Sequence, residues 1–418
     1  MASEQGQASV EYLGVVAVVG VLLAALAVPA LAGRDVAGAV VAEVRRALCI
    51  VAGGQCWLDR RPCVVASSQV TDDGSVDLAI IRIGSREVVL RQERSDGTVA
   101  VTFLRDRLAG LDLTAGGGAQ LRVGRTTLRL GTQAEATVLA MLGSGTTWVL
   151  RDARAADRLV RGLVVDGAGD LGRRVLHGGR PDTRGAPAPA WSASRRGLAV
   201  TLVATTAGAG HGGALRLGSE DLAGVATQHA TGRRTFVVRR RNDLVGSITR
   251  GQSDVLGGAG AVDELYTVTV DRVGRPLDLG VLRGGEVGVH IGGPAPLRAL
   301  RGARRWEAEE HLDLSDPENL AAARDFLREV VAPRPRLGAA VAVSAALRRR
   351  LDEAGVLDVR AYALSGVATG IGVAVGTGVG HLGAGYERRR QRLRLVGAAQ
   401  RGPEGLWRAR GDCTRGVA

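Results

Sequence analysis

The residues best suited to catalysis or metal binding are six dispersed histidines and one acidic cluster. The cluster comprises Glu307, Glu309, Glu310, His311, Asp313 and Asp316. Carboxylates beside an imidazole could bind a metal ion or exchange protons with a substrate. However, Glu307, Glu309, His311 and Asp313 alternate as on the water-facing side of a strand, and Asp316 belongs to a predicted helix start. We therefore expect no metal ion and no cofactor.

Common catalytic motifs are missing from the sequence. It contains neither a GxSxG nucleophile elbow nor an HExxH zinc motif. The usual phosphate-binding loop needs a lysine, and all 55 residues counted as lysine or arginine are arginine. The sequence therefore predicts a protein that is not an enzyme. The function of an envelope hydrolase is a further alternative, but no motif supports it.

The strong positive charge says little about partners. The net charge is +13, but arginine is scattered through every region with acidic residues between, and aromatic residues make up only 3%. Arginine in place of lysine, together with 61 glycines, is typical of a GC-rich genome of the actinobacterial type. Nucleic-acid binding proteins cluster their arginines and add aromatic residues for stacking. We therefore expect no nucleic-acid partner.

The four cysteines suggest disulfides. Cys49, Cys56 and Cys63 lie close together, and Cys413 lies near the other end. Their spacing lacks the CxxC pairs of zinc sites. If the domain lies outside the cytoplasm, the oxidising environment there favours disulfide formation. We expect Cys49 to pair with Cys56 and Cys63 with Cys413, and the other two connectivities stay open.

The amino-terminal segment predicts a membrane span. Residues 12–33 carry no charge and are numerous enough to cross the ~30 Å hydrocarbon core of a bilayer as a helix. One interpretation is a plain anchor. Another is a secretory signal cleaved after Ala32, because Ala30 and Ala32 form an A-x-A pattern behind Pro29.

A third interpretation explains Glu11, a carboxylate at the front of this span. The stretch GQASVEY, with Gly6, Gln7, Glu11 and Tyr12, resembles the class III signal of type IV prepilins, in particular the Flp and TadE-like branch. The resemblance implies that a prepilin peptidase cuts after Gly6, that Gln7 becomes the new terminus, and that Glu11 and Tyr12 act in assembly with other pilin-like subunits. The leader lacks the usual basic residue, and arginines follow the span instead, at Arg34, Arg45 and Arg46.

The remaining chain predicts strands with a few helices. Strands are expected over 76–83, 87–94 and 98–104, with turns at 84–85 and 95–97. Thr132 and Glu135 form a capping box for a short helix through Met141, and a second helix covers 151–163. A Pro/Gly-rich linker is expected at 177–191, and further strands are expected after it, one of which ends at a turn over 271–276. Two helices are expected at 315–331, capped by Ser315, and at 337–355.

A glycine-rich segment at 365–380 has two interpretations. Its even positions from 366 to 380 are Gly or Ala, and its odd positions from 367 to 379 are Val, Ile or Thr. Strict alternation favours a long strand. The rival is a membrane helix that packs through GxxxG pairs such as Gly372 and Gly376.

Together these patterns predict an α+β protein with one transmembrane helix. The expected parts are a leader at 1–6, the helix at 7–33, a juxtamembrane cysteine-rich segment at 34–63, a β-meander at 64–176, the linker at 177–191 and a second β-rich region at 192–418. The expected function is that of a pilin-like, single-pass cell-membrane protein with its large domain outside the cytoplasm, serving surface structure or assembly. The alternative is a tethered domain that binds a lipid or peptide.

Overall fold

The computed structural model describes residues 61–124, 126–164, 183, 186–208, 211–250, 253–291, 302–330, 344–377, 380–403 and 405–414. These residues belong to one compact unit, Arg61–Ala418, which is described by itself. The expected leader, membrane span and most of the juxtamembrane segment lie outside the described residues, as do Gly6, Gln7, Glu11, Tyr12, Cys49 and Cys56.

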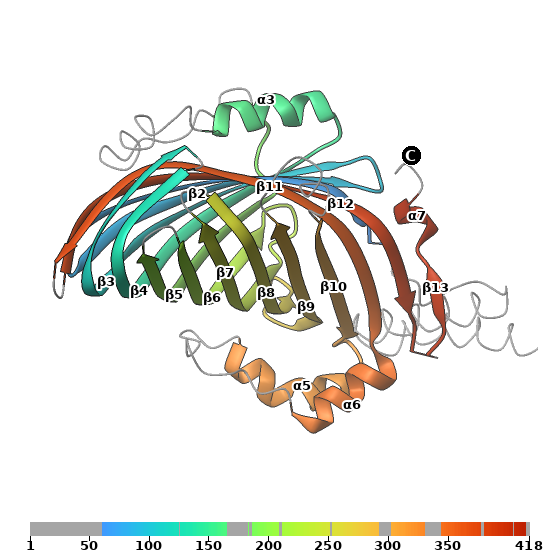
Figure 1. Cartoon of the computed structure of the whole chain (residues 1–418). Coiled ribbons are helices and arrows are strands. Elements are labelled where there is room, and N and C mark those ends of the chain that lie inside the picture. The colour runs from blue at the N-terminus through green and yellow to red at the C-terminus, as the bar shows by residue number, and fades with distance from the viewer. Residues whose placement is uncertain are drawn as a thin grey trace, which may run out of the picture. The chain divides into compact units, whose positions relative to one another are not determined.

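Twelve long strands form a closed antiparallel barrel (Figure 1). They are β1 (Val64–Ala79), β2 (Ile81–Arg94), β3 (Val99–Gly124), β4 (Thr126–Leu150), β5 (Trp191–Gly208), β6 (His211–Gln228), β7 (Arg234–Arg250), β8 (Ser253–Val270), β9 (Pro276–Ile291), β10 (Gly302–Asp313), β11 (Val356–Thr377) and β12 (Gly380–Arg401). Each strand pairs with the next, and β1 pairs with β12 from Ala66–Arg394 to Ala79–His381, which closes the ring. A short β13 (Trp407–Ala409) pairs antiparallel with the end of β12, and the ends of β3 and β11 also pair.

Turn chemistry fixes the register where the strands reverse. Between β2 and β3, Gly97 adopts φ +80°, and the Asp96 carboxylate accepts a hydrogen bond from the Thr98 backbone N–H at 2.9 Å. Between β8 and β9, the Asp271 carboxylate accepts from the backbone N–H groups of Val273 and Arg275. Both turns confirm the sequence predictions.

The helices pack on the barrel at one end of the strands. Helix α3 (Ala153–Leu163) buries Leu159 and Leu163 against residues of β2, β3 and β4, among them Phe103 and Trp148. Helices α5 (Pro317–Val330) and α6 (Ala345–Ala354) bury Phe326, Leu347 and other residues against β8, β9 and the end of β10. A short α7 (Gly411–Thr414) follows β13. No helix in the described part of the chain is long and apolar enough to cross a membrane.

Several expectations need correction. The fold is a closed β-barrel and not an α+β domain. The helix expected from Thr132 to Met141 is part of β4, because that segment pairs with β3 and β5 along its length. The turn expected at 84–85 lies instead between β1 and β2, at Ile80. The strands on either side of 177–191 pair directly, so 64–176 and 192–418 contribute to one sheet.

Other expectations are confirmed. The glycine-rich segment is a strand through Thr377, paired with β12. The helices expected at 151–163, 315–331 and 337–355 correspond to α3, α5 and α6, although α6 begins only at Ala345. The cap of α5 differs, because the Asp316 carboxylate and not Ser315 accepts from the Glu318 backbone N–H at 2.8 Å.

Candidate functional site: the lumen of the barrel

An ion pair crosses the inside of the barrel. Arg86 on β2 donates to Asp73 on the neighbouring β1 at 2.7 Å and to Glu220 on β6 at 3.1 Å. Along the sheet, β3, β4 and β5 separate β2 from β6, so Arg86 and Glu220 meet only across the enclosed space. The alternate positions that include Asp73, Arg86 and Glu220 therefore face the lumen.

A second arginine, Arg82 on β2, binds carboxylates from three other strands close to the Arg86–Glu220 ion pair. The Arg82 guanidinium lies 2.7 Å from the Asp112 carboxylate on β3 and 3.3 Å from Glu135 on β4, and it also binds Asp77 on β1. Asp112 is fully buried. A buried carboxylate is costly unless it is paired, so this arginine is required for the burial of its partners.

Ion pairs continue around the lumen wall. Arg195 on β5 donates two hydrogen bonds to Asp106 on β3, at 2.7 and 2.6 Å. On the other wall, Arg241 on β7 and Arg305 on β10 share Asp263 and Glu286. Each of these arginines binds carboxylates from a different strand, so the network joins the strands through their side chains as well as through the backbone.

Part of the acidic cluster of the sequence analysis, namely Glu307, Glu309 and His311, faces this lumen towards the end where the helices pack. Glu310 lies on the other face of β10, where it binds Arg283 at 3.4 Å, and Asp316 caps α5. His311 lies 3.0 Å from Glu309 and 3.4 Å from Asp278, and Glu309 also binds Arg360. His311 and these carboxylates thus form a structural polar cluster.

A cavity of about 350 Å³, lined by both charged and apolar side chains, lies within this network. Its lining includes Arg82, Arg86, Glu135, Glu220 and Arg389. The enclosed space thus carries charged groups from several strands, unlike an apolar binding site for a lipid. Water and small ions are the occupants that such a lining can solvate.

The outer face of the same strands carries a broad set of exposed apolar side chains, beside ion pairs such as Asp221–Arg240. Large hydrophobic side chains alternate with the lumen residues and are 42 to 67% exposed on this face: Val76, Leu78, Ile81, Ile83, Leu111, Leu113, Val138, Leu142, Leu202, Leu215, Leu217, Leu244, Val262, Trp306 and Leu382, with Val287 at 61%. Neighbours in the register form continuous rows, such as Leu382–Leu78–Ile81–Leu111–Val138. We call this surface the apolar band. Contiguous exposed apolar surface of this extent marks a lipid or protein contact.

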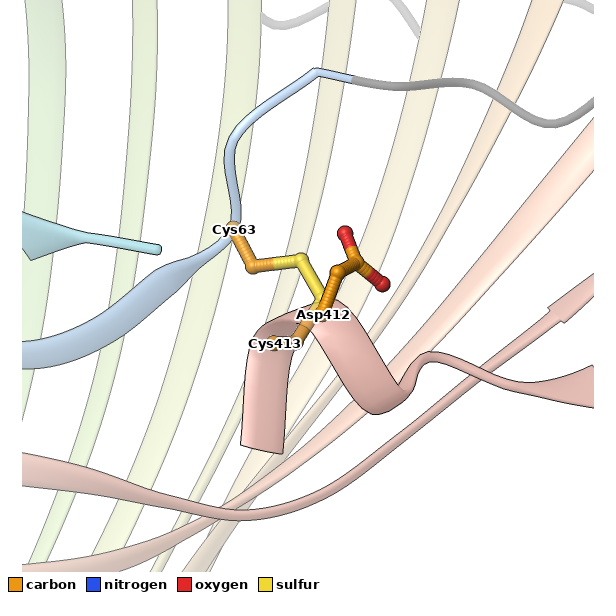
Figure 2. A group of neighbouring side chains, drawn as sticks. All are labelled: Cys63, Asp412 and Cys413. Carbon is orange, nitrogen blue, oxygen red and sulfur yellow. A yellow bond between two sulfur atoms is a disulfide. The ribbon is translucent and has the colours of Figure 1, made fainter. Parts of the chain in front are cut away.

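The cysteines tie the two ends of the barrel chain together. Figure 2 shows Cys63, just before β1, bonded to Cys413 in α7, which is the pairing expected from the sequence. Asp412 lies beside them, but Arg410 binds its carboxylate at 2.8 Å. Since both sulfur atoms are in the disulfide, these three residues do not offer a metal site.

Solved structures of other barrels are similar to this chain only at a coarse level. The translocator domain of the autotransporter NalP from Neisseria meningitidis is 9% identical, with 86% of this chain and 96% of that chain covered and a TM-score of 0.22. The transport unit of the autotransporter AIDA-I from Escherichia coli is 6% identical, with coverages of 85% and 98% and a TM-score of 0.21. No family model and no curated protein matches the chain. Since both TM-scores are far below 0.5, the fold assignment rests on the strand pairing alone.

The barrel overturns the pilin-like interpretation. That interpretation required an α+β domain carried by one membrane helix, whereas the described chain is a closed sheet with a charged lumen and an apolar outer face. The description as a pilin-like, single-pass cell-membrane protein with a class III signal is therefore wrong, and so is the location inferred from it. The likeness of residues 6–12 to a prepilin signal lies outside the described residues and stays a prediction.

Sequence reasoning identified the cluster around His311 but missed the other lumen residues. Arg82 stands between Ile81 and Ile83, and such alternation was the available signal, but Arg86 is followed by Glu87 and Glu220 by Asp221, so the pattern is lost there. It indicated a polar face but could not tell a lumen from a solvent-facing side.

Proposed function

We propose that the barrel inserts into a lipid bilayer and encloses a polar passage, held closed by ion pairs, for water and small ions. The observation that carries this proposal is the division of the strands: alternate positions carry paired charges inside and exposed large hydrophobic side chains outside. Transmembrane barrels have this pattern, because lipid contacts one face of the sheet and water or polar side chains contact the other. The lumen carboxylates are thus assigned to closure and not to catalysis.

Strand length supports the same proposal. A tilted strand needs about 9–11 residues to cross a bilayer. Each barrel strand has from 12 to 26 residues, so each can cross, and the remaining length is available for the region where α3, α5 and α6 pack. An even number of antiparallel strands closed without a free edge satisfies the backbone hydrogen bonds within lipid.

A substitution in the apolar band tests the proposal. Ile81 is 50% exposed on the outer face, and Ile81→Arg would place a charge in the hydrocarbon region, where arginine costs about 2–4 kcal/mol. We expect the full chain with this change to insert into phosphatidylcholine vesicles far less completely than wild type, measured by protection of the barrel from added protease.

Val273→Arg is the matched control. Val273 is 73% exposed but lies in the turn between β8 and β9, outside the band, so this variant should insert normally. Equal insertion of Ile81→Arg and Val273→Arg would refute the assignment of the band to lipid.

A further inference from the structure

We propose that outward-facing arginines of β12 and α3 form a binding surface for the phosphate groups of anionic lipids. The surface, here named the basic surface, consists of Arg390, Arg392 and Arg394 on β12 and Arg151, Arg154, Arg158 and Arg161 in and just before α3. All seven are exposed. The inference rests on the proposed function, because it assigns the surface to the edge of the bilayer.

The arginines of α3 lie on one side of the helix. Positions 151, 154, 158 and 161 follow the three- and four-residue spacing that places side chains on a common helical face. The buried residues Ala156, Leu159 and Leu163 occupy the opposite face and pack on the barrel. The helix therefore turns its basic face away from the strands, as amphipathic helices at a membrane interface do.

The arginines of β12 change character along the strand. Arg388 and Arg389 bind carboxylates, with Arg388 2.7 Å from Asp72 and Arg389 3.7 Å from Asp73. Arg390 and Arg392 come next on the same strand, and among the described residues neither has a carboxylate partner. These two arginines therefore carry charge that the barrel does not neutralise.

The surroundings of Arg392 leave room for a ligand. Arg392 pairs across the sheet with Ser68 on β1 and Ser365 on β11, whose hydroxyls can donate hydrogen bonds to a phosphate. These residues line a depression of about 760 Å³ that also reaches Asp157 on α3. Glu93 is a second carboxylate in this lining. Arg91 binds both carboxylates, Asp157 at 3.0 Å, so neither neutralises Arg392.

The position along the barrel matches the headgroup region. Leu382, 64% exposed in the apolar band, precedes Arg390 by about eight positions on β12, or ~27 Å along the strand. At the usual strand tilt of about 40°, this is ~20 Å along the barrel axis, close to half of the ~40–45 Å between the two headgroup surfaces of a bilayer. With Leu382 near the bilayer centre, Arg390 lies among the headgroups.

The described part of the barrel exposes few aromatic side chains that could hold its depth in a bilayer. Membrane barrels normally hold their depth with girdles of aromatic residues at both interfaces. Among the described residues, the exposed large aromatic side chains are Trp306 and Trp407. Guanidinium groups, which bind phosphate through two parallel hydrogen bonds, can take over this role at the interface.

The test compares lipids that remain bound to the full chain. The protein is reconstituted into vesicles with equal amounts of phosphatidylglycerol and phosphatidylcholine, extracted in mild detergent, and its retained lipids are counted by mass spectrometry. Wild type should retain phosphatidylglycerol in excess. Arg390→Gln combined with Arg392→Gln should weaken this preference up to roughly 30-fold, because each basic residue at an anionic surface contributes about a factor of five.

A matched control removes two exposed arginines elsewhere. Arg233→Gln with Arg272→Gln changes turns between strands, outside the basic surface, and should keep the wild-type preference. An unchanged preference in the β12 variant, or a loss of equal size in both variants, would overturn the inference while leaving the barrel proposal intact. Failure of wild type to insert into any vesicle would instead refute the proposed function. Soluble glycerophosphate added in excess should not displace the retained lipid, and displacement would assign the surface to free phosphates.

Discussion

Removing the charge of Glu220 should favour an open lumen. Arg86 is held between Asp73 at 2.7 Å and Glu220 at 3.1 Å, and all three side chains are largely buried. Breaking a buried ion pair completely costs about 3–5 kcal/mol, and one hydrogen bond to a charged group is worth about 1.5–3 kcal/mol. Glu220→Gln keeps the shape of the side chain, and Arg86 keeps Asp73. We therefore expect the closed state to lose about 2 kcal/mol, which raises the ratio of open to closed barrels roughly 30-fold.

Current recordings across a planar bilayer containing the full chain would measure this ratio directly. Glu264→Gln is the matched control. Glu264 lies on β8 next to the lumen residue Asp263 and therefore faces outwards, so the substitution removes the same charge outside the passage. Glu264→Gln should conduct like wild type. A Glu220→Gln barrel that opens no more often than wild type would show that the Arg86–Glu220 contact does not close the passage.

A further prediction concerns stability. Gly110→Ala should lower the free energy of unfolding by over ~1 kcal/mol, because a Cβ there would lie 1.9 Å from the Val138 carbonyl oxygen. Gly397→Ala is the control and should be neutral, because a Cβ there would meet nothing within 4 Å. Thermal unfolding of both variants would detect the difference, and equal midpoints would show that the wall at Gly110 can adjust.

Local patterns predicted the strands better than the sheet that they form. The alternation from 365 to 377 correctly indicated a strand, because period two is a property of the single strand. The segment from Thr132 to Met141 was misjudged because its capping-box spacing is also compatible with a strand. In the structure, Glu135 does not cap a helix but binds Arg82 inside the lumen.

The closed ring depends on contacts that local patterns do not contain. Asp72 on β1 and Arg388 on β12 form an ion pair across the seam, yet 316 positions separate them in the sequence. The pairing of such distant strands follows from the number, length and tilt of all twelve, and no single segment carries that information. The acidic cluster shows the same limit, since its alternation was recognised but the Arg360 that neutralises Glu309 comes from a neighbouring strand outside the cluster.

The seam between β1 and β12 determines when the protein can become a barrel. During synthesis, β1 emerges early, and its outer edge has no permanent partner until nearly the entire chain has followed. An uncovered strand edge readily pairs with other chains, so every incomplete form of this protein is prone to aggregation at that edge. The Cys63–Cys413 bond lies beside the same seam and can form only once both ends have met. Closure therefore has to wait for β12, and once the two thiols are oxidised the disulfide holds both ends of the chain at the closed seam.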